Sequence, residues 1–210
     1  FGITQGTSAT TYGPDESIPR WQMALFLHRM FVPTGLAAAG TTTVPAFTDT
    51  ADLSAEIQAA ITAIASHGIT VGTSATTFGP NDNVTREQMA LFLYRFGKKI
   101  KPYDTATDVT GIFDDAAADI ASGSYNFSDI AGATFEGMEA IIAMYNIGAT
   151  GETCTALTIA ANPAACATTY RPTADITRAE MATMIKAVLD LSNARPAGAT
   201  IQTTTAVTAT

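Results

Sequence analysis

A long internal repeat constrains this chain more than any other feature of its sequence. Residues 2–29 return 66 residues later at 68–95, with most positions unchanged. A third, weaker copy has Tyr-Arg-Pro at 170–172 and Ile-Thr-Arg-Ala-Glu-Met-Ala at 176–182. Because chance does not produce matches of this length, the chain is expected to fold as copies of one supersecondary unit that share a core.

Each full copy has the pattern of a helix, a loop and a second helix. The boxes Thr-Arg-Glu-Gln at 85–88 and Thr-Arg-Ala-Glu at 177–180 predict where two of the second helices begin, because Thr and the residue three positions later cap each other's amides. In the first copy Pro19 takes the place of the Thr, so this box is absent. The apolar residues of the second helices share one register, which predicts a common core: Met23, Phe26, Leu27 and Met30; Met89, Phe92, Leu93 and Phe96; Met181, Met184, Ile185 and Val188.

The repeats divide the chain into segments. Residues 1–43 form a first repeat that lacks its first helix, so the sequence is expected to be part of a longer chain. Residues 44–97 form the second repeat, and 98–126 are an insertion. Residues 127–192 form the third repeat, whose loop carries an insertion with both cysteines. Residues 193–210 are rich in Ala and Thr, as in a linker or a strand that enters a further domain.

Composition narrows the possible partners. The net charge of −8 and the sequence pI near 4.5 argue against nucleic-acid binding, which depends on a positive field. The apolar stretches are too short for a membrane span, so no membrane insertion is expected. We expect no cofactor and no enzyme activity, since the sequence has no phosphate loop, zinc spacing or paired catalytic carboxylates.

The sequence contains acidic loops and two cysteines that could form a metal site or a disulfide. The acidic loops at 15–17 and 81–83 do not have the spacing of an EF-hand, so no metal site is expected. Cys154 and Cys166 could close a short loop, and a bridge there would stabilise the fold by about 3 kcal/mol. Two free thiols in a reducing compartment are the alternative.

These motifs resemble the S-layer homology domain family. The resemblance is carried by Phe-x-Asp at 47–49, an amphipathic helix, Gly-Ile-x-x-Gly at 68–72, an aromatic-x-Pro, and Ile/Val-Thr-Arg-x-x-Met-Ala at the second helix. The sequence of these repeats is similar to repeats of bacterial surface proteins and to repeats in virion structural proteins of tailed phages. The resemblance implies a mainly α, pseudo-threefold helical unit of helix-loop-helix repeats with loop insertions.

The resemblance also implies binding sites. In this family, grooves between repeats hold a cell-wall polysaccharide that often bears a pyruvate ketal, and the Arg of the Thr-Arg motif contacts the anionic sugar. By position these arginines are Arg20, Arg86 and Arg178. Glycines would let the ligand approach the backbone, and an exposed Trp21 could stack on a sugar ring; the glycines are Gly6, Gly72 and Gly151.

Structural roles for the same residues remain open. Each Arg could instead pair with a carboxylate of a neighbouring loop, such as Asp15, Asp82 or Asp175. Asp49 and Asp129 of the Phe-x-Asp motif are expected to cap the turn that follows them.

Two functions follow. The first is a non-catalytic anchor that holds a larger protein to bacterial cell-wall polysaccharide, outside the cell at its surface or wall. The second is a structural assembly or host-attachment module of a virion, in which the repeats pack against neighbouring subunits and bind no sugar. A homo-oligomer is compatible with either function.

Overall fold

The computed structural model describes residues 2–4, 6–100, 127–150, 169–192 and 194. Within these ranges the regular structure is helical, and extended backbone pairs only in isolated bridges, which confirms the expected mainly α class. The two cysteines, most of the insertion 98–126 and nearly all of the tail 193–210 lie outside the described residues. The helices are α1 (Arg20–Arg29), α2 (Phe31–Thr34), α3 (Ala55–Ser66), α4 (Arg86–Gly97), α6 (Phe135–Asn146) and α8 (Arg178–Leu191).

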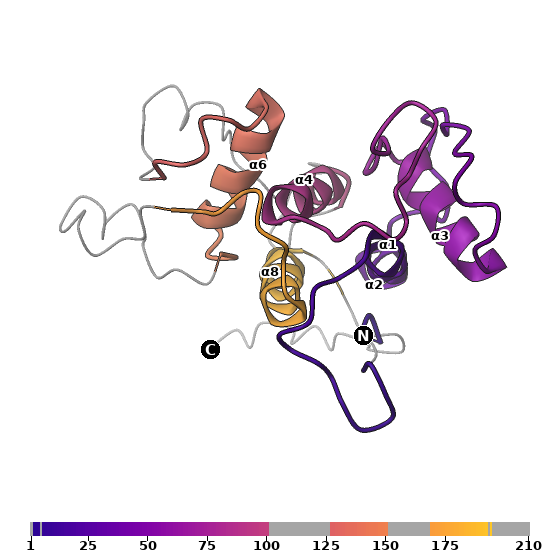
Figure 1. The fold of residues 1–210 in the computed structure, drawn as a ribbon, viewed down its shortest axis with the longest axis horizontal. Helices are drawn as coiled ribbons and strands as arrows, with labels where there is room; N and C mark the ends of the chain where they lie inside the picture. The colour runs from indigo at the N-terminus through magenta and orange to yellow at the C-terminus, as the bar shows by residue number, and fades with distance from the viewer. Residues whose placement is uncertain (1, 5, 101–126, 151–168, 193, 195–210) are drawn as a thin grey trace, which may run out of the picture.

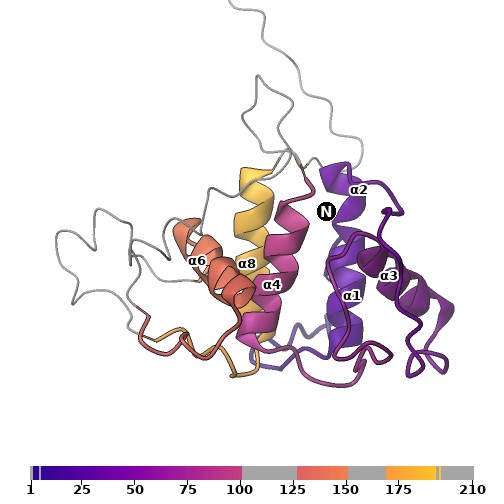
Figure 2. The ribbon, with the colours of Figure 1, turned by 90° about the horizontal axis from the view of Figure 1, so that it is seen from above.

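The second helices of the three repeats, α1, α4 and α8, lie together in the middle of the molecule (Figure 1). The first helices lie outside them: α3 packs on α1, and α6 packs on α4 (Figure 2). Each of these first helices therefore covers the central helix of the preceding repeat, so neighbouring repeats are interlocked.

One hydrophobic core joins the repeats. The residues predicted to share a register on the central helices are all buried, and they belong to a single cluster that also takes in Ile61 and Ile64 of α3 and Ile141 and Ile142 of α6. Burying an aliphatic or aromatic side chain of this size contributes about 1.5–3 kcal/mol. The common core predicted from the apolar register is confirmed.

The helix starts follow the predicted capping residues. In α4 and α8 both halves of the capping box form, between Thr85 and Gln88 and between Thr177 and Glu180. Pro19 precedes α1 and makes no side-chain cap, as its lack of a hydroxyl requires.

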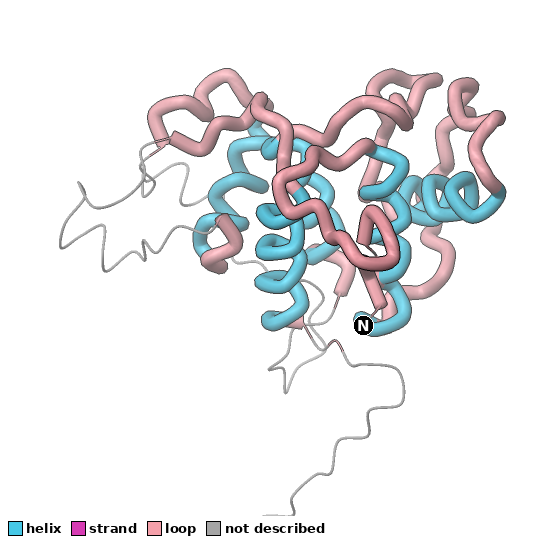
Figure 3. Tube along the Cα trace, turned by 60° about the horizontal axis from the view of Figure 1, so that its bottom comes forward, coloured by secondary structure: helices cyan, strands magenta, loops and turns pink. Residues whose placement is uncertain are grey.

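The loops that lead into the central helices meet at one end of the molecule (Figure 3). Three antiparallel bridges join them in a ring, Pro19 with Asn83, Thr85 with Asp175, and Ser17 with Thr177. In each case the first amide of a central helix donates to a carbonyl of another repeat's loop, at 2.9 Å. The pairs are Arg20 N with Asp82 O, Arg86 N with Ala174 O, and Arg178 N with Glu16 O. Helix amides that would otherwise have no partner thus link the first repeat to the second, the second to the third, and the third to the first.

We predict that removing one capping hydroxyl weakens the whole fold. In Thr85→Ala the amide of Gln88 loses its acceptor, so the free energy of unfolding should fall by about 1 kcal/mol. Urea denaturation of this variant measures the change, with exposed Thr41→Ala as the control. Equal stability of the two variants would contradict this role for the cap.

Candidate functional site

The three arginines singled out from the sequence occupy the same place in each repeat. Arg20, Arg86 and Arg178 are the first residues of α1, α4 and α8. Their exposed fractions are only 3%, 4% and 2%. A guanidinium taken this far out of water needs hydrogen-bond partners on the protein or on a ligand.

Each arginine reaches across to the aromatic residue of the next repeat's loop. Its Nε donates to the backbone carbonyl of that residue, and its guanidinium lies over the ring, 4.7–4.8 Å from the centroid. This contact combines a hydrogen bond with a cation–π interaction. The hydrogen bonds join Arg20 to Phe78 at 2.8 Å, Arg86 to Tyr170 at 2.7 Å, and Arg178 to Tyr12 at 2.8 Å.

The same arginines also reach the third residue of the next repeat's central helix. Nη1 of Arg20 donates to Gln88 at 3.2 Å and Nη1 of Arg178 donates to Gln22 at 3.1 Å, whereas Arg86 forms an ion pair with Glu180 at 2.6 Å. The expected pairing with a carboxylate of the neighbouring loop is therefore wrong for Arg20 and Arg86.

Two carboxylates attract the Arg20 guanidinium electrostatically, although neither forms an ion pair with it. Burial lowers the pKa of Arg20, and the charges of Asp82 and Asp49 act in the opposite direction. This guanidinium nevertheless remains a cation at neutral pH, because arginine is not deprotonated in proteins.

Asp49 and Asp129 hold the aromatic residues in place. Asp49 accepts hydrogen bonds from the amides of Phe78 and Gly79, and Asp129 accepts them from Tyr170 and Arg171, at closest distances of 2.7–2.8 Å. The expectation that these carboxylates cap the turn that follows them is corrected, since their partners lie about 30 or 40 residues further along the chain. Each carboxylate therefore holds in place the loop of its own repeat, and this is the loop that the arginine of the preceding repeat contacts.

Backbone hydrogen bonds also set the charge state of Asp49. Burial alone would raise its pKa, but the amides of Phe78 and Gly79, its own amide and the charge of Arg20 outweigh burial, so the pKa lies below the ordinary 3.8. The carboxylate is ionised throughout the neutral range.

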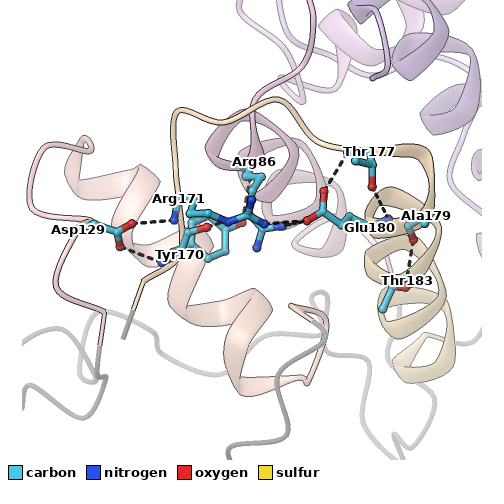
Figure 4. A network of polar contacts seen from close by, with 8 residues as sticks. All are labelled: Arg86, Asp129, Tyr170, Arg171, Thr177, Ala179, Glu180 and Thr183. Atoms are coloured by element: carbon cyan, nitrogen blue, oxygen red, sulfur yellow. Dashed lines mark hydrogen bonds and ion pairs between the residues drawn. The ribbon is translucent and has the colours of Figure 1, made fainter. Parts of the chain in front are cut away.

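The third repeat adds a second arginine to this arrangement (Figure 4). Arg171 donates to the same Glu180 oxygen as Arg86, at 3.1 Å. Burial would raise the pKa of Glu180, but hydrogen bonding from Thr177 and the charges of Arg86 and Arg171 lower it below its ordinary value. Glu180 is thus an ionised carboxylate shared by two guanidinium groups.

Three grooves lie beside these arginines, one at each junction between repeats. The groove between the first and second repeats holds about 300 Å³ and is lined by Arg20, Gln88 and Gly72 among others. The groove between the third and first repeats holds about 150 Å³, with Arg178 and Gln22 in its wall. The remaining groove has Arg86 and Glu180 in its described wall, and its volume is about 60 Å³.

The largest groove combines polar and apolar surface. Val71 is 58% exposed at this groove, and Leu91 and Phe92 line the same wall. Arg95 also lines it, but its guanidinium is held by Glu136 of α6 through two hydrogen bonds of 2.8 and 2.6 Å. Arg20 is thus the groove's guanidinium without a carboxylate bound to it, in the part of the chain that the structure describes.

Two of the expected glycines, Gly6 and Gly72, and Trp21 also line the grooves. Gly6 and Trp21 lie beside Arg178, and Trp21 is partly buried rather than exposed. A Cβ at Gly72 would come within 2.5 Å of Phe47 and of the Thr77 carbonyl, and one at Gly6 within 2.3 Å of the Thr11 carbonyl. The loops themselves thus require both glycines. Gly151 lies outside the described residues.

Sequence reasoning missed the side chains that receive the arginines. Gln88 and Glu180 were recognised only as the second members of capping boxes, and Gln22 was not singled out. Their signal was available, because all three stand two residues after a repeated Arg. Only the folded arrangement shows that the partner Arg comes from a different repeat.

The described residues contain no group of three or more His, Cys, Asp or Glu side chains placed to hold a metal ion. None of their helices is long and apolar enough to cross a membrane.

We predict that the geometry of the Arg20 side chain matters, beyond its charge. Lys in Arg20→Lys cannot bond both the Phe78 carbonyl and Gln88 as the guanidinium does, so the variant should lose about 1–3 kcal/mol of stability. In Arg29→Lys the altered ion pair is with the exposed Glu56 and can be kept by Lys, so this variant should lose less than about 0.5 kcal/mol. Denaturant titration of both variants compares them, and equal losses would contradict a special role for Arg20.

Acid should weaken the loop contacts made by Asp49. Because its folded-state pKa is lowered, its contribution to stability is fully present above the unfolded-state pKa and is lost as the pH falls through the folded-state value. Wild type should therefore lose more stability than Asp49→Asn when the pH falls from neutral to below 3.8. Thermal unfolding across this range tests the prediction, and parallel pH curves for the two proteins would contradict it.

Parts of this chain are similar in sequence to known proteins. An endoglucanase of Bacillus sp. (strain KSM-635) is 38% identical over 94 residues, which are 44% of this chain and 9% of that protein. The chain therefore spans only a small part of this relative's length. Residues 46–90 match the S-layer homology domain family; they contain Asp49, α3, the loop of Phe78 and the start of α4 with Arg86. The second repeat of this chain thus carries a match to the S-layer homology domain.

Proposed function

We propose that this chain is a non-catalytic surface module that holds a larger protein to the polysaccharide of a bacterial cell wall. The sites are the grooves between repeats. The observation that carries the proposal is the groove between the first and second repeats, which places a buried cation beside apolar surface next to the S-layer homology match. By analogy with that family, its ligand is a wall polysaccharide that carries an acidic group.

The chemistry of this groove suits an acidic sugar. A pyranose ring has an apolar face of C–H groups and a rim of hydroxyls, which match the wall of Val71 and Leu91 and the side-chain amide of Gln88. The Arg20 guanidinium supplies planar donors for a carboxylate. Because this positive charge is local, an acidic polymer can bind although the whole chain carries a charge of −8.

Repetition of the grooves supports anchoring over catalysis. A polymer that meets several weak sites on one chain is retained by effective concentration, which favours attachment without any tight single site. The buried arginines of the grooves, and the Gln or Glu that accepts from each of them, are engaged in contacts between repeats, and we assign none of them to a reaction. Any activity of the longer protein belongs to regions outside this chain.

The proposal is tested at an exposed groove residue, because substituting the buried arginines would also damage the fold. A carboxylate in Val71→Glu would repel an acidic ligand and block the apolar wall, so the affinity for purified walls should fall about tenfold. Val32→Glu is the matched control, since Val32 is 78% exposed and does not line this groove. Co-sedimentation with walls, before and after their polysaccharide is removed, measures both variants.

Two results would contradict the anchor. One is a wild-type chain that stays in solution with intact walls although circular dichroism shows it folded. The other is equal pelleting of Val71→Glu and Val32→Glu. Failure to pellet would shift attention to protein partners, as the assembly interpretation requires.

A further inference from the structure

The groove of Arg20 and the groove of Arg86 differ at one position that contacts the buried arginine. The third residue of the central helix is Gln88 in the groove of Arg20 and Glu180 in the groove of Arg86. These side chains have nearly the same size and both complete a capping box, so they differ chiefly in charge. The chain thus presents the same site with a neutral and with an anionic partner.

In the groove of Arg20 the cation is held by neutral groups. Its Nε and Nη1 donate to the Phe78 carbonyl and to Gln88, while Nη2 makes no hydrogen bond or ion pair with any described residue. Asp49 and Asp82 attract this guanidinium from a distance, yet neither forms an ion pair with it. A buried cation with one unbonded nitrogen therefore lines a groove of about 300 Å³.

In the groove of Arg86 the chain provides its own anion. One Glu180 oxygen binds Arg86 at 2.6 Å and Arg171 at 3.1 Å, and the other accepts the amide of Thr177 at 2.9 Å (Figure 4). An incoming carboxylate would have to displace this charge-assisted contact or lie beside a like charge.

Arg171, which also binds Glu180, has a backbone conformation that is unusual for an arginine. Arg171 has a left-handed backbone with φ of 58°, where the other repeats have Gly13 at 64° and Gly79 at 68°. An arginine is less favourable than glycine in this conformation. Here that conformation accompanies a second cation on Glu180.

We propose that the residue at this third position decides which groove accepts the acidic group of the polysaccharide. Gln88 leaves Arg20 open to a ligand carboxylate, and Glu180 keeps that carboxylate away from Arg86. This inference rests on the proposed function and distinguishes the groove of Arg20 from the groove of Arg86 as a site of charge recognition.

Reciprocal substitutions test the inference without disturbing the fold. Gln88→Glu gives the Arg20 groove its own anion, and Glu180→Gln removes the anion beside Arg86 and Arg171. Each new residue already occupies the equivalent capping position elsewhere in the chain, and melting temperatures check that the variants are folded. The groove of Arg178, which has the amide of Gln22, stays the same in all variants.

The probe is the acidic polysaccharide released from the walls, together with the same polymer after its carboxylates are reduced to alcohols. We expect Gln88→Glu to bind the acidic polymer about tenfold more weakly than wild type, and Glu180→Gln about tenfold more tightly. The double variant should bind about as well as wild type. The reduced polymer should bind weakly and equally to every variant.

Site-resolved spectra show where binding occurs. The Nε–H groups of Arg20 and Arg86 donate to protein carbonyls, which slows their exchange with water and lets NMR follow them one by one. The acidic polymer should shift the Arg20 signal in wild type and the Arg86 signal in the double variant.

The possible failures are distinguishable. Loss of wall binding by every folded form, wild type included, would overturn the proposed function and this inference with it. Wild-type binding that neither substitution changes, or that the reduced polymer reproduces, would overturn the inference alone. A shift of Arg86 in wild type would overturn it as well.

Discussion

A guanidinium can leave water only where its donors find new partners, and this requirement shapes the junctions between the repeats. Each arginine sits at the start of one central helix and bonds a carbonyl and a side chain of the next repeat. The receiving loops are fixed in turn, by Asp49 and Asp129 in the second and third repeats. The arginine, the loop aromatic and the helix-start hydrogen bonds therefore act together, so the fold closes as a ring of three junctions and each groove takes its shape from one of them.

Much of the fold could be predicted from the sequence because it is encoded locally and repeated. Capping residues and apolar registers predicted the central helices and their shared core, and both are confirmed. The partner of each arginine could not be predicted, since it lies in a different repeat and depends on the order of the repeats around the ring. The same reason explains Asp49, whose short-range role as a turn cap was plausible from its neighbours but whose actual partner is Phe78.

The candidate site was predicted in outline only. Glycines and arginines were identified by position, and Gly6, Gly72 and the three arginines do line grooves between repeats. Their physical roles differ from the expectation: Gly72 is needed by the packing of its own loop, and two of the three guanidinium nitrogens of Arg20 donate to the next repeat. In a groove of this kind, the ligand can be bound only by those polar groups of the junction that are not already used in contacts between repeats. Small changes at the junction, such as an amide in place of a carboxylate, can then alter recognition while the fold is kept.

The most direct test of this account is a crystal structure of the chain with a fragment of wall polysaccharide that contains an acidic sugar. The account predicts the acidic group at Nη2 of Arg20, with the sugar ring against Val71 and Leu91 in the groove between the first and second repeats. A fragment bound on the outer faces of α3 or α6, or anywhere outside the grooves, would contradict it.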